Sequence, residues 1–182
     1  MWFKILIAVS FLMVICFIYI QLASIPVDSI EKASKGQSFT DKDRFLNLDG
    51  TPFNETHDLT VGLPRVYMYF DPSCSACVSM VKMILKNYIE FEMIDFVLVS
   101  ESSMEELIIF SNSHSLGDYT NIIVVQDSMR KFANQFGLIE TPSFVIYDSS
   151  MVLVKILDQY VTFSIVVRYV REAVNSSCQT SL

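Results

Sequence analysis

Basic residues are scarce in this chain of 182 residues, which has 13 Lys and Arg against 20 Asp and Glu. All the acidic residues and twelve of the basic ones follow residue 23, so this part carries a net charge of −8. It shows no basic patch interleaved with aromatic residues, and such an acidic domain disfavours a nucleic-acid partner. The sequence also lacks internal repeats and low-complexity segments. These absences leave a globular protein that does not bind nucleic acid.

Cysteine is also limited, with four residues in the whole chain. Cys74 and Cys77 form a Cys-x-x-Cys, whereas Cys16 lies in an apolar run and Cys178 stands alone near the C-terminus. Four cysteines in this arrangement do not make a disulfide scaffold. A Cys-x-x-Cys is also half of a zinc site, but the other cysteines and the two histidines have no ligand-like spacing. We therefore predict no metal site and no cofactor.

Charge is absent from residues 5–20, and the apolar stretch from Trp2 to Ala23 is about long enough to span a bilayer. We favour an uncleaved signal anchor; a cleaved signal peptide is the alternative, and its usual pair of small residues is missing before the possible cut sites. Lys4 is the only charge before the span, which favours a cytoplasmic N-terminus and an extracytoplasmic domain. We predict a membrane anchor over 1–23, a tether over 24–40, a domain over 41–176 and a tail over 177–182.

The part that follows the tether is long enough for one domain with a hydrophobic core. Its apolar pattern alternates between strand and helix periods, which predicts βαβ units, and a late hairpin makes the sheet mixed. We predict strands over 66–70, 94–100 and 121–125, an early hairpin over 45–53, and a late one from 143–147 and 152–156. We predict helices over 74–91, 104–110, 128–136 and 162–173, the third of them capped by Ser128 and closed by Gly137.

The most informative stretch joins an aromatic-rich run, Tyr67 to Phe70, through the turn Asp71-Pro72-Ser73 to Cys74 and Cys77. A helix N-terminus offers unpaired N–H groups and a partial positive charge, both of which stabilise a thiolate. We therefore predict that Cys74 is the nucleophile. Cys77, one turn later on the same face, is predicted to resolve the mixed disulfide and to form a Cys74–Cys77 redox disulfide. Half a zinc site and an inert structural dithiol are the alternatives.

A second signal is Thr141-Pro142, directly before the buried run over residues 144–147. Proline at this place is unusual because it donates no hydrogen bond to a neighbouring strand. A cis peptide bond would expose the Thr141 backbone beside the cysteines, where it could pair with an extended substrate. An ordinary trans proline is the alternative. We favour cis after an upstream Cys-x-x-Cys, and we predict that Thr141 and Pro142 bind substrate.

Together these residues resemble the thioredoxin superfamily, and more closely its membrane-anchored TlpA/ResA-type branch. The resemblance covers about residues 36–174 and rests on the Cys-x-x-Cys unit, on Thr141-Pro142 and on the hairpin with Leu48-Asp49-Gly50. It implies an α/β, thioredoxin-like fold with a central mixed sheet flanked by helices, an N-terminal hairpin, a central helix–strand insertion and an N-terminal transmembrane helix. It further implies exchange with protein thiols and disulfides outside the cytoplasm, and a membrane or extracytoplasmic electron donor.

Several positions depart from that family. Ser73 stands where thioredoxins carry Trp, and Ser75-Ala76 replaces their Gly-Pro. Met68 stands where a buried acid usually aids proton transfer from the resolving thiol, and Glu140 or Asp71 are candidates to replace that acid. Peroxidase relatives carry Thr at the position of Asp71, so peroxidase activity is disfavoured.

We predict an extracytoplasmic, membrane-anchored thiol–disulfide oxidoreductase, on the periplasmic or cell-surface side, that reduces disulfides of specific protein clients. One alternative is a binding module that holds a partner at Thr141-Pro142 without turnover, as the absence of an acid at Met68 would permit. A second is a metal-delivery assembly factor. Thioredoxin-like proteins of that kind use a Cys-x-x-x-Cys and a downstream His, whereas the spacing here is one residue shorter and the downstream candidate is His114.

Overall fold

The structure is a computed structural model that describes residues 45–179, and for 177–179 the backbone alone. The predicted anchor, the tether and the last three residues of the predicted tail lie outside this range, and so does Cys16. Within residues 45–179, no helix is both long enough and apolar enough to cross a membrane.

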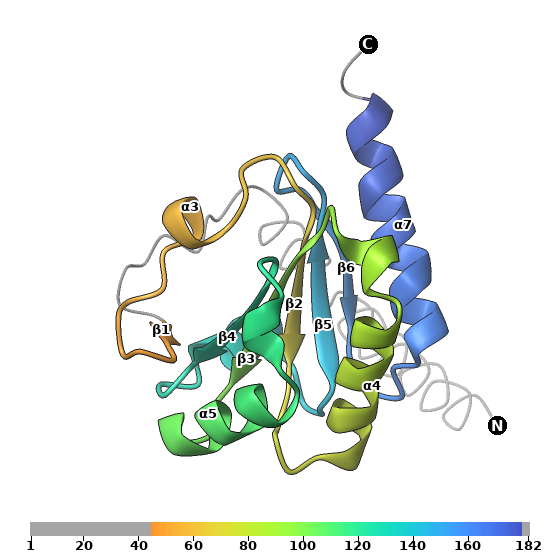
Figure 1. Ribbon diagram of the computed structural model, residues 1–182. Helices are drawn as coiled ribbons and strands as arrows, with labels where there is room; N and C mark the ends of the chain where they lie inside the picture. Colours follow the sequence, from red (N-terminus) through yellow and green to blue (C-terminus); the bar gives the residue numbers. More distant parts are fainter. Residues whose placement is uncertain (1–44, 180–182) are drawn as a thin grey trace, which may run out of the picture. The chain divides into compact units, whose positions relative to one another are not determined.

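Six strands of the described residues form one mixed sheet (Figure 1). Strand β2 lies inside the sheet, parallel to β3 and antiparallel to β5. Beyond β3 come β4, parallel to it, and then β1, antiparallel to β4, whereas β6 pairs antiparallel with β5 at the other edge. In order across the sheet, the strands are β1 (Leu46–Asn47), β4 (Ile122–Gln126), β3 (Asp95–Ser100), β2 (Arg65–Tyr69), β5 (Ser143–Tyr147) and β6 (Leu153–Leu157).

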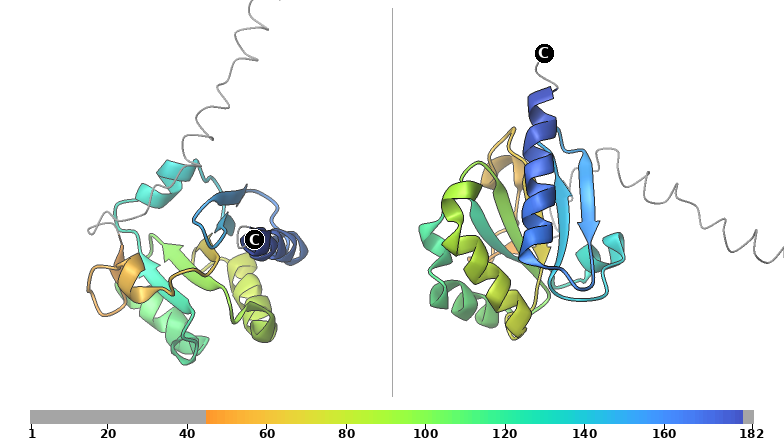
Figure 2. Two further views of the ribbon diagram at one scale, coloured as in Figure 1. Left: turned by 90° about the horizontal axis from the view of Figure 1, so that it is seen from above. Right: turned by 90° about the vertical axis from the view of Figure 1, so that its right-hand side faces the viewer.

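Helices cover both faces of the sheet (Figures 1 and 2). Side chains of α4 (Ser75–Lys86), α5 (Met104–Ser113) and α7 (Phe163–Gln179) pack with every second strand residue, such as Met68 and Leu98, into one buried cluster. On the other face, α6 (Lys131–Phe136) and the segment before β2 pack on the alternate residues, such as Tyr67 and Val97. The inner strands β2, β3 and β5 are therefore buried on both sides, as their continuous apolar runs require. The short helices are α3 (Glu55–Asp58), η1 (Tyr88–Phe91) and η2 (Leu116–Asp118).

Each predicted strand and helix is present; β5 has the predicted bounds, and the ends of the others are shifted. The early hairpin is minimal: β1 has two residues, and its return arm makes an isolated bridge from Leu46 to Pro52 around the turn with Gly50 at φ 80°. The predicted helix over 74–91 divides at Asn87, whose side-chain amide donates to the Met83 carbonyl at 2.7 Å and ends α4. The final helix runs past Ala173 to Gln179, so the start of the predicted tail is helical.

The cap of α6 differs from the prediction. Ser128 is exposed and does not cap the helix; instead the buried Asp127 carboxylate accepts hydrogen bonds from the N–H groups of Lys131 at 3.1 Å and Phe132 at 2.6 Å. Asp127 follows β4 directly and its N–H donates to the Ser100 carbonyl at 2.7 Å, so the sheet fixes the carboxylate where the helix begins. Gly137 closes α6 with a φ of 65°, as predicted.

Candidate active site

Cys74 lies where β2 leads into α4, and it is the N-cap residue of that helix. The turn before it is held by Asp71, whose carboxylate accepts hydrogen bonds from the N–H and the hydroxyl of Ser73, each at 2.7 Å. The Cys74 N–H in turn donates to the Asp71 carbonyl at 3.0 Å. The Cys74 sulfur takes the place of a capping oxygen, because the N–H of Cys77 donates to it at 3.3 Å. The helix start thus points a backbone donor at the sulfur.

The two cysteines, both free thiols, differ in exposure. Cys74 is partly exposed, whereas Cys77 has an exposed fraction of 0% and belongs to the core cluster that contains Met68. A reagent or a client can therefore reach Cys74. Cys77 can react only with a disulfide that Cys74 has already formed.

The pKa values of the two thiols move in opposite directions. Burial alone would raise the pKa of Cys74, but hydrogen bonds from the Cys77 thiol and from the Cys77 N–H outweigh it, so the pKa of Cys74 lies below its ordinary value. Burial, and then the hydrogen bond to Cys74, raises the pKa of Cys77 to about 12. Since the thiolate is the nucleophile in exchange, Cys74 is the sulfur ready to attack.

Met68 gives Cys77 an apolar neighbour at the position where the resemblance led us to expect an acid. Its side chain is completely buried in the cluster with Cys77. The two proposed replacements do not take its place in the core: the side chains of Asp71 and Glu140 are exposed, and that of Asp71 bonds to Ser73. A hydrogen bond with the Asp71 backbone opposes the rise in the pKa of Cys77, but burial outweighs it.

The Thr141–Pro142 peptide bond is cis, as predicted. The pairing of β2 with β5 places Ser143 opposite Tyr69, so the loop before β5 reaches the same end of the sheet as Cys74. There the Cys74 thiol lies 3.7 Å from the Thr141 carbonyl oxygen. The structure thus brings together Cys74, Cys77 and Thr141, with the buried Pro142 behind Thr141.

Asp158, at the end of β6, holds the loop that contains Thr141. Its carboxylate accepts hydrogen bonds from the N–H of Ile139 at 3.3 Å and from the N–H of Glu140 at 3.2 Å. The Ser143 hydroxyl lies within hydrogen-bond distance of the same carboxylate and 2.6 Å from the Glu140 carbonyl. Sequence reasoning missed Asp158, because a lone acid after an apolar strand carries no motif.

His114 has other partners. Its Nδ1 lies 2.9 Å from the Phe110 carbonyl and 2.9 Å from the Ser113 hydroxyl, and its ring packs against the Phe110 ring. Among residues 45–176, no three or more His, Cys, Asp or Glu side chains gather in a way that could hold a metal ion.

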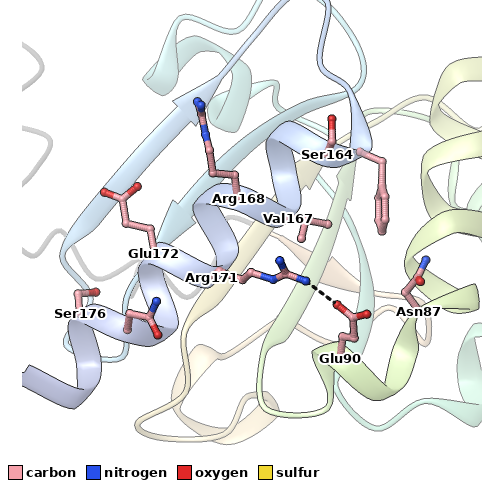
Figure 3. Close-up of a pocket in the computed structure, with 10 residues that line it drawn as sticks. Asn87, Glu90, Ser164, Val167, Arg168, Arg171, Glu172 and Ser176 are labelled. Carbon is pink, nitrogen blue, oxygen red and sulfur yellow. Dashed lines mark hydrogen bonds and ion pairs between the residues drawn. The ribbon is translucent and has the colours of Figure 1, made fainter.

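A pocket of about 930 Å³ lies between η1 and α7, and neither cysteine lines it (Figure 3). Arg171 reaches across it to Glu90, with 3.2 Å between guanidinium and carboxylate. Arg168 and Glu172 point away from this pair, so the charged groups do not converge on a common point. We assign this pocket no part in the chemistry of the cysteines.

No protein-family model and no curated protein matches this sequence. Solved structures do match. An uncharacterized thioredoxin-like protein from Porphyromonas gingivalis is 19% identical with a TM-score of 0.59, and the match covers 74% of this chain and 90% of that one. A secreted Mycobacterium tuberculosis disulfide oxidoreductase homologous to E. coli DsbE is 16% identical with a TM-score of 0.58, covering 72% and 96%.

A third similar structure is the exposed lipoprotein thioredoxin of Streptococcus pneumoniae, 17% identical with a TM-score of 0.54, covering 71% of this chain and 97% of that one. At these identities the likeness concerns the path of the backbone. It agrees with the strand order and with the helices on both faces of the sheet. The domain of this chain therefore has a thioredoxin-like fold.

Proposed function

We propose that this chain is a thiol–disulfide oxidoreductase that reduces disulfides of specific protein clients. The observation that carries the proposal is the asymmetry of the two thiols: Cys74 is reachable at a helix start with a lowered pKa, and Cys77 is buried behind it with a raised one. An inert structural dithiol does not require this difference in pKa and exposure. Thiol–disulfide exchange requires one nucleophilic thiol and one resolving thiol.

The reaction follows from that asymmetry. The Cys74 thiolate attacks one sulfur of a client disulfide, which forms a Cys74–client disulfide and releases the other client sulfur as a thiolate that takes up a proton. Cys77 then loses its proton and attacks the Cys74 sulfur, so that the second client thiolate leaves. The client gains two electrons and the pair ends as the Cys74–Cys77 disulfide. A reduced partner must then restore the dithiol.

Thr141 is the proposed contact for the client backbone. Its carbonyl lies 3.7 Å from the Cys74 thiol, so a client segment whose sulfur reaches Cys74 passes along it. Hydrogen bonds with the Thr141 backbone would hold such a segment as an added strand. We propose that Pro142 fixes the course of the backbone at Thr141 and so shapes the surface that the client segment contacts.

We further propose that the domain acts outside the cytoplasm, anchored by residues 1–23. The charge-free run and the lone Lys4 before it support this location. The secreted and lipoprotein neighbours in the structural comparison are consistent with it. The electron donor would then lie in the membrane or on its extracytoplasmic side.

The test uses the domain after residue 23, equilibrated in thiol buffers of graded potential. Mass shifts after alkylation report the Cys74–Cys77 disulfide. A midpoint near roughly −270 mV, as in thioredoxin, is expected for a reductant, whereas one near roughly −120 mV would mean an oxidant. In exchange assays Cys74→Ser should lose activity and Cys77→Ser should accumulate mixed disulfides. Variants that both behave like the parent would sink the proposal.

A binding module without turnover is the second candidate, and the buried Met68 favours it, because no acid stands there to take the proton of Cys77. The two functions differ in what happens when both cysteines become alanine. A module of this kind would still capture its partner in the Cys74→Ala/Cys77→Ala variant. Under our first proposal covalent capture disappears.

A further inference from the structure

We infer that Asp158 is a positioning residue that sets the Thr141 backbone against Cys74 for the docking of protein clients. The inference rests on the proposed exchange function and extends it to a residue outside the Cys-x-x-Cys and Thr-Pro motifs.

The Asp158 carboxylate serves the two residues directly before Thr141. It accepts from the N–H groups of Ile139 and Glu140, at 3.3 and 3.2 Å. Ile139 and Glu140 are both exposed and form a loop whose N–H groups no strand partner takes up, so these bonds fix the loop against the end of β6. The next carbonyl along the chain, that of Thr141, is the one that lies 3.7 Å from the Cys74 thiol.

Ser143 closes the arrangement from the other side of Pro142. Its side chain is completely buried, and its hydroxyl lies 2.6 Å from the Glu140 carbonyl and close to the Asp158 carboxylate. The segment from residue 139 to residue 143 is thus tied to Asp158 at both ends. Thr141 lies between the two ties, with its backbone free of the Asp158 carboxylate and facing Cys74.

The backbone after Asp158 is also unusual. Gln159 and Tyr160 adopt φ values of 62° and 50°, in the left-handed region that side chains other than glycine rarely occupy. Two such residues in succession carry a local cost and persist where surrounding contacts hold them. Asp158, directly before them, makes the contacts that join this turn to the Thr141 loop.

A carboxylate could act here by charge or by position, and the two roles predict opposite effects on Cys74. Loss of a nearby negative charge lowers the pKa of a thiol. Loss of the ordered loop displaces the Thr141 side chain, whose hydrogen bond helps to hold the pKa of Cys74 down, and so raises that pKa. The inference therefore predicts an upward shift of the Cys74 pKa in Asp158→Ala, which removes both accepting oxygens.

Asp148 supplies a matched control. Its carboxylate likewise accepts two backbone N–H groups, those of Ser150 and Val152, each at 2.9 Å. It lies after β5, at the opposite end of the strand from Ser143. Asp148→Ala therefore removes a similar set of bonds without touching the loop at Cys74.

The experiment measures three quantities for the parent, Asp158→Ala and Asp148→Ala: the pH profile of Cys74 alkylation, the urea midpoint, and exchange rates with oxidised glutathione and with a cyclic peptide disulfide. In Asp158→Ala we expect the peptide rate to fall about tenfold or more, the glutathione rate to stay within about twofold, and the Cys74 profile to move to higher pH. Asp148→Ala should lower the urea midpoint and leave both rates in place. Ser143→Ala, which keeps the carboxylate, should reproduce the peptide defect in weaker form.

Three results would overturn the inference: equal losses with both substrates, a downward shift of the Cys74 profile in Asp158→Ala, or peptide rates alike in the two Asp variants. If Asp158→Ala fails to fold, Ser143→Ala carries the test alone, and an unchanged peptide rate there refutes the role. A parent that exchanges with neither disulfide would instead contradict the proposed function.

Discussion

The sulfur of Cys74 lies 3.7 Å from the carbonyl oxygen of Thr141, a residue 67 positions later in the chain. The contact exists because β5 runs antiparallel to β2 and starts where β2 ends. A cysteine at a helix start and a carbonyl before a proline are ordinary features separately. Side by side they make a place where an incoming chain can be both attacked and held.

The first prediction concerns the order in which the two thiols react. With iodoacetamide at increasing pH, Cys74 should be alkylated first. The pH at which its rate is half-maximal should lie below the ordinary cysteine pKa, because hydrogen bonds from Cys77 favour its thiolate. Cys77, with a pKa of about 12, should stay protected over that range. Peptide mapping by mass spectrometry resolves the two sites. In urea both should react alike, and preferential labelling of Cys77 in the folded protein would contradict the assignment.

The second prediction concerns Met68. Replacing it by Asp places a carboxylate in the cluster with Cys77, where it can accept the thiol proton. The release of trapped client in single-turnover assays should become faster. Burying this acid should also lower the free energy of unfolding by several kcal/mol, on the order expected for an uncompensated polar group. Met68→Leu is the apolar control; release that is equally fast in both variants would argue against a missing base.

A third prediction concerns the buried ion pair far from the cysteines. The Glu55 carboxylate lies 2.9 Å from the Arg65 guanidinium and accepts the Tyr67 hydroxyl at 2.6 Å, and all three residues are buried. Glu55→Gln leaves the Arg65 charge uncompensated and should cost on the order of 3 kcal/mol in urea unfolding.

The exposed pair of Glu90 with Arg171 is the control for Glu55. Both side chains are more than half exposed, so Glu90→Gln should change the free energy of unfolding by less than about 1 kcal/mol. Exchange rates per folded molecule should be the same in both variants. A larger loss in Glu90→Gln than in Glu55→Gln would show that burial does not govern these pairs.

The fourth prediction separates two adjacent residues before α6. Asp127→Ala removes the carboxylate that accepts the first N–H groups of the helix and should destabilise the domain by about 1–2 kcal/mol. Ser128→Ala, at an exposed position, should stay within about 0.5 kcal/mol of the parent. Thermal or urea unfolding measures both losses. A larger loss in Ser128→Ala than in Asp127→Ala would support Ser128 as the cap, as predicted from the sequence.

Most of the fold could be predicted from the sequence because its signals are local. The apolar runs that form β2 and β3 depend on residues within a few positions of one another. The prediction that Ser128 caps α6 was wrong. Asp and Ser are equally good capping residues, so residue type alone could not choose between Asp127 and Ser128. The sheet decides between them, by holding Asp127 at the end of β4.

The candidate site divides in the same way. Cys74, Cys77 and the cis Thr141–Pro142 bond could be inferred from motifs, and the structure brings the three together. Asp158 could not be inferred in this way. Its proposed role depends on hydrogen bonds to residues that lie 15 to 19 positions earlier in the chain but close to it in space. Short motifs identify reacting atoms, whereas the groups that hold them are set by the register of β5 and β6.

The place of β2 inside the sheet has a consequence for hydrogen exchange. Its N–H groups bond to β3 on one side and β5 on the other, whereas β1 and β6 lie at the two edges. Fluctuations that open an edge strand leave β2 paired, so the amide protons of β2 should exchange with solvent only when the whole domain unfolds. The turn that carries Cys74 begins at the end of β2. Partial opening at an edge of the sheet should therefore leave the start of this turn in place.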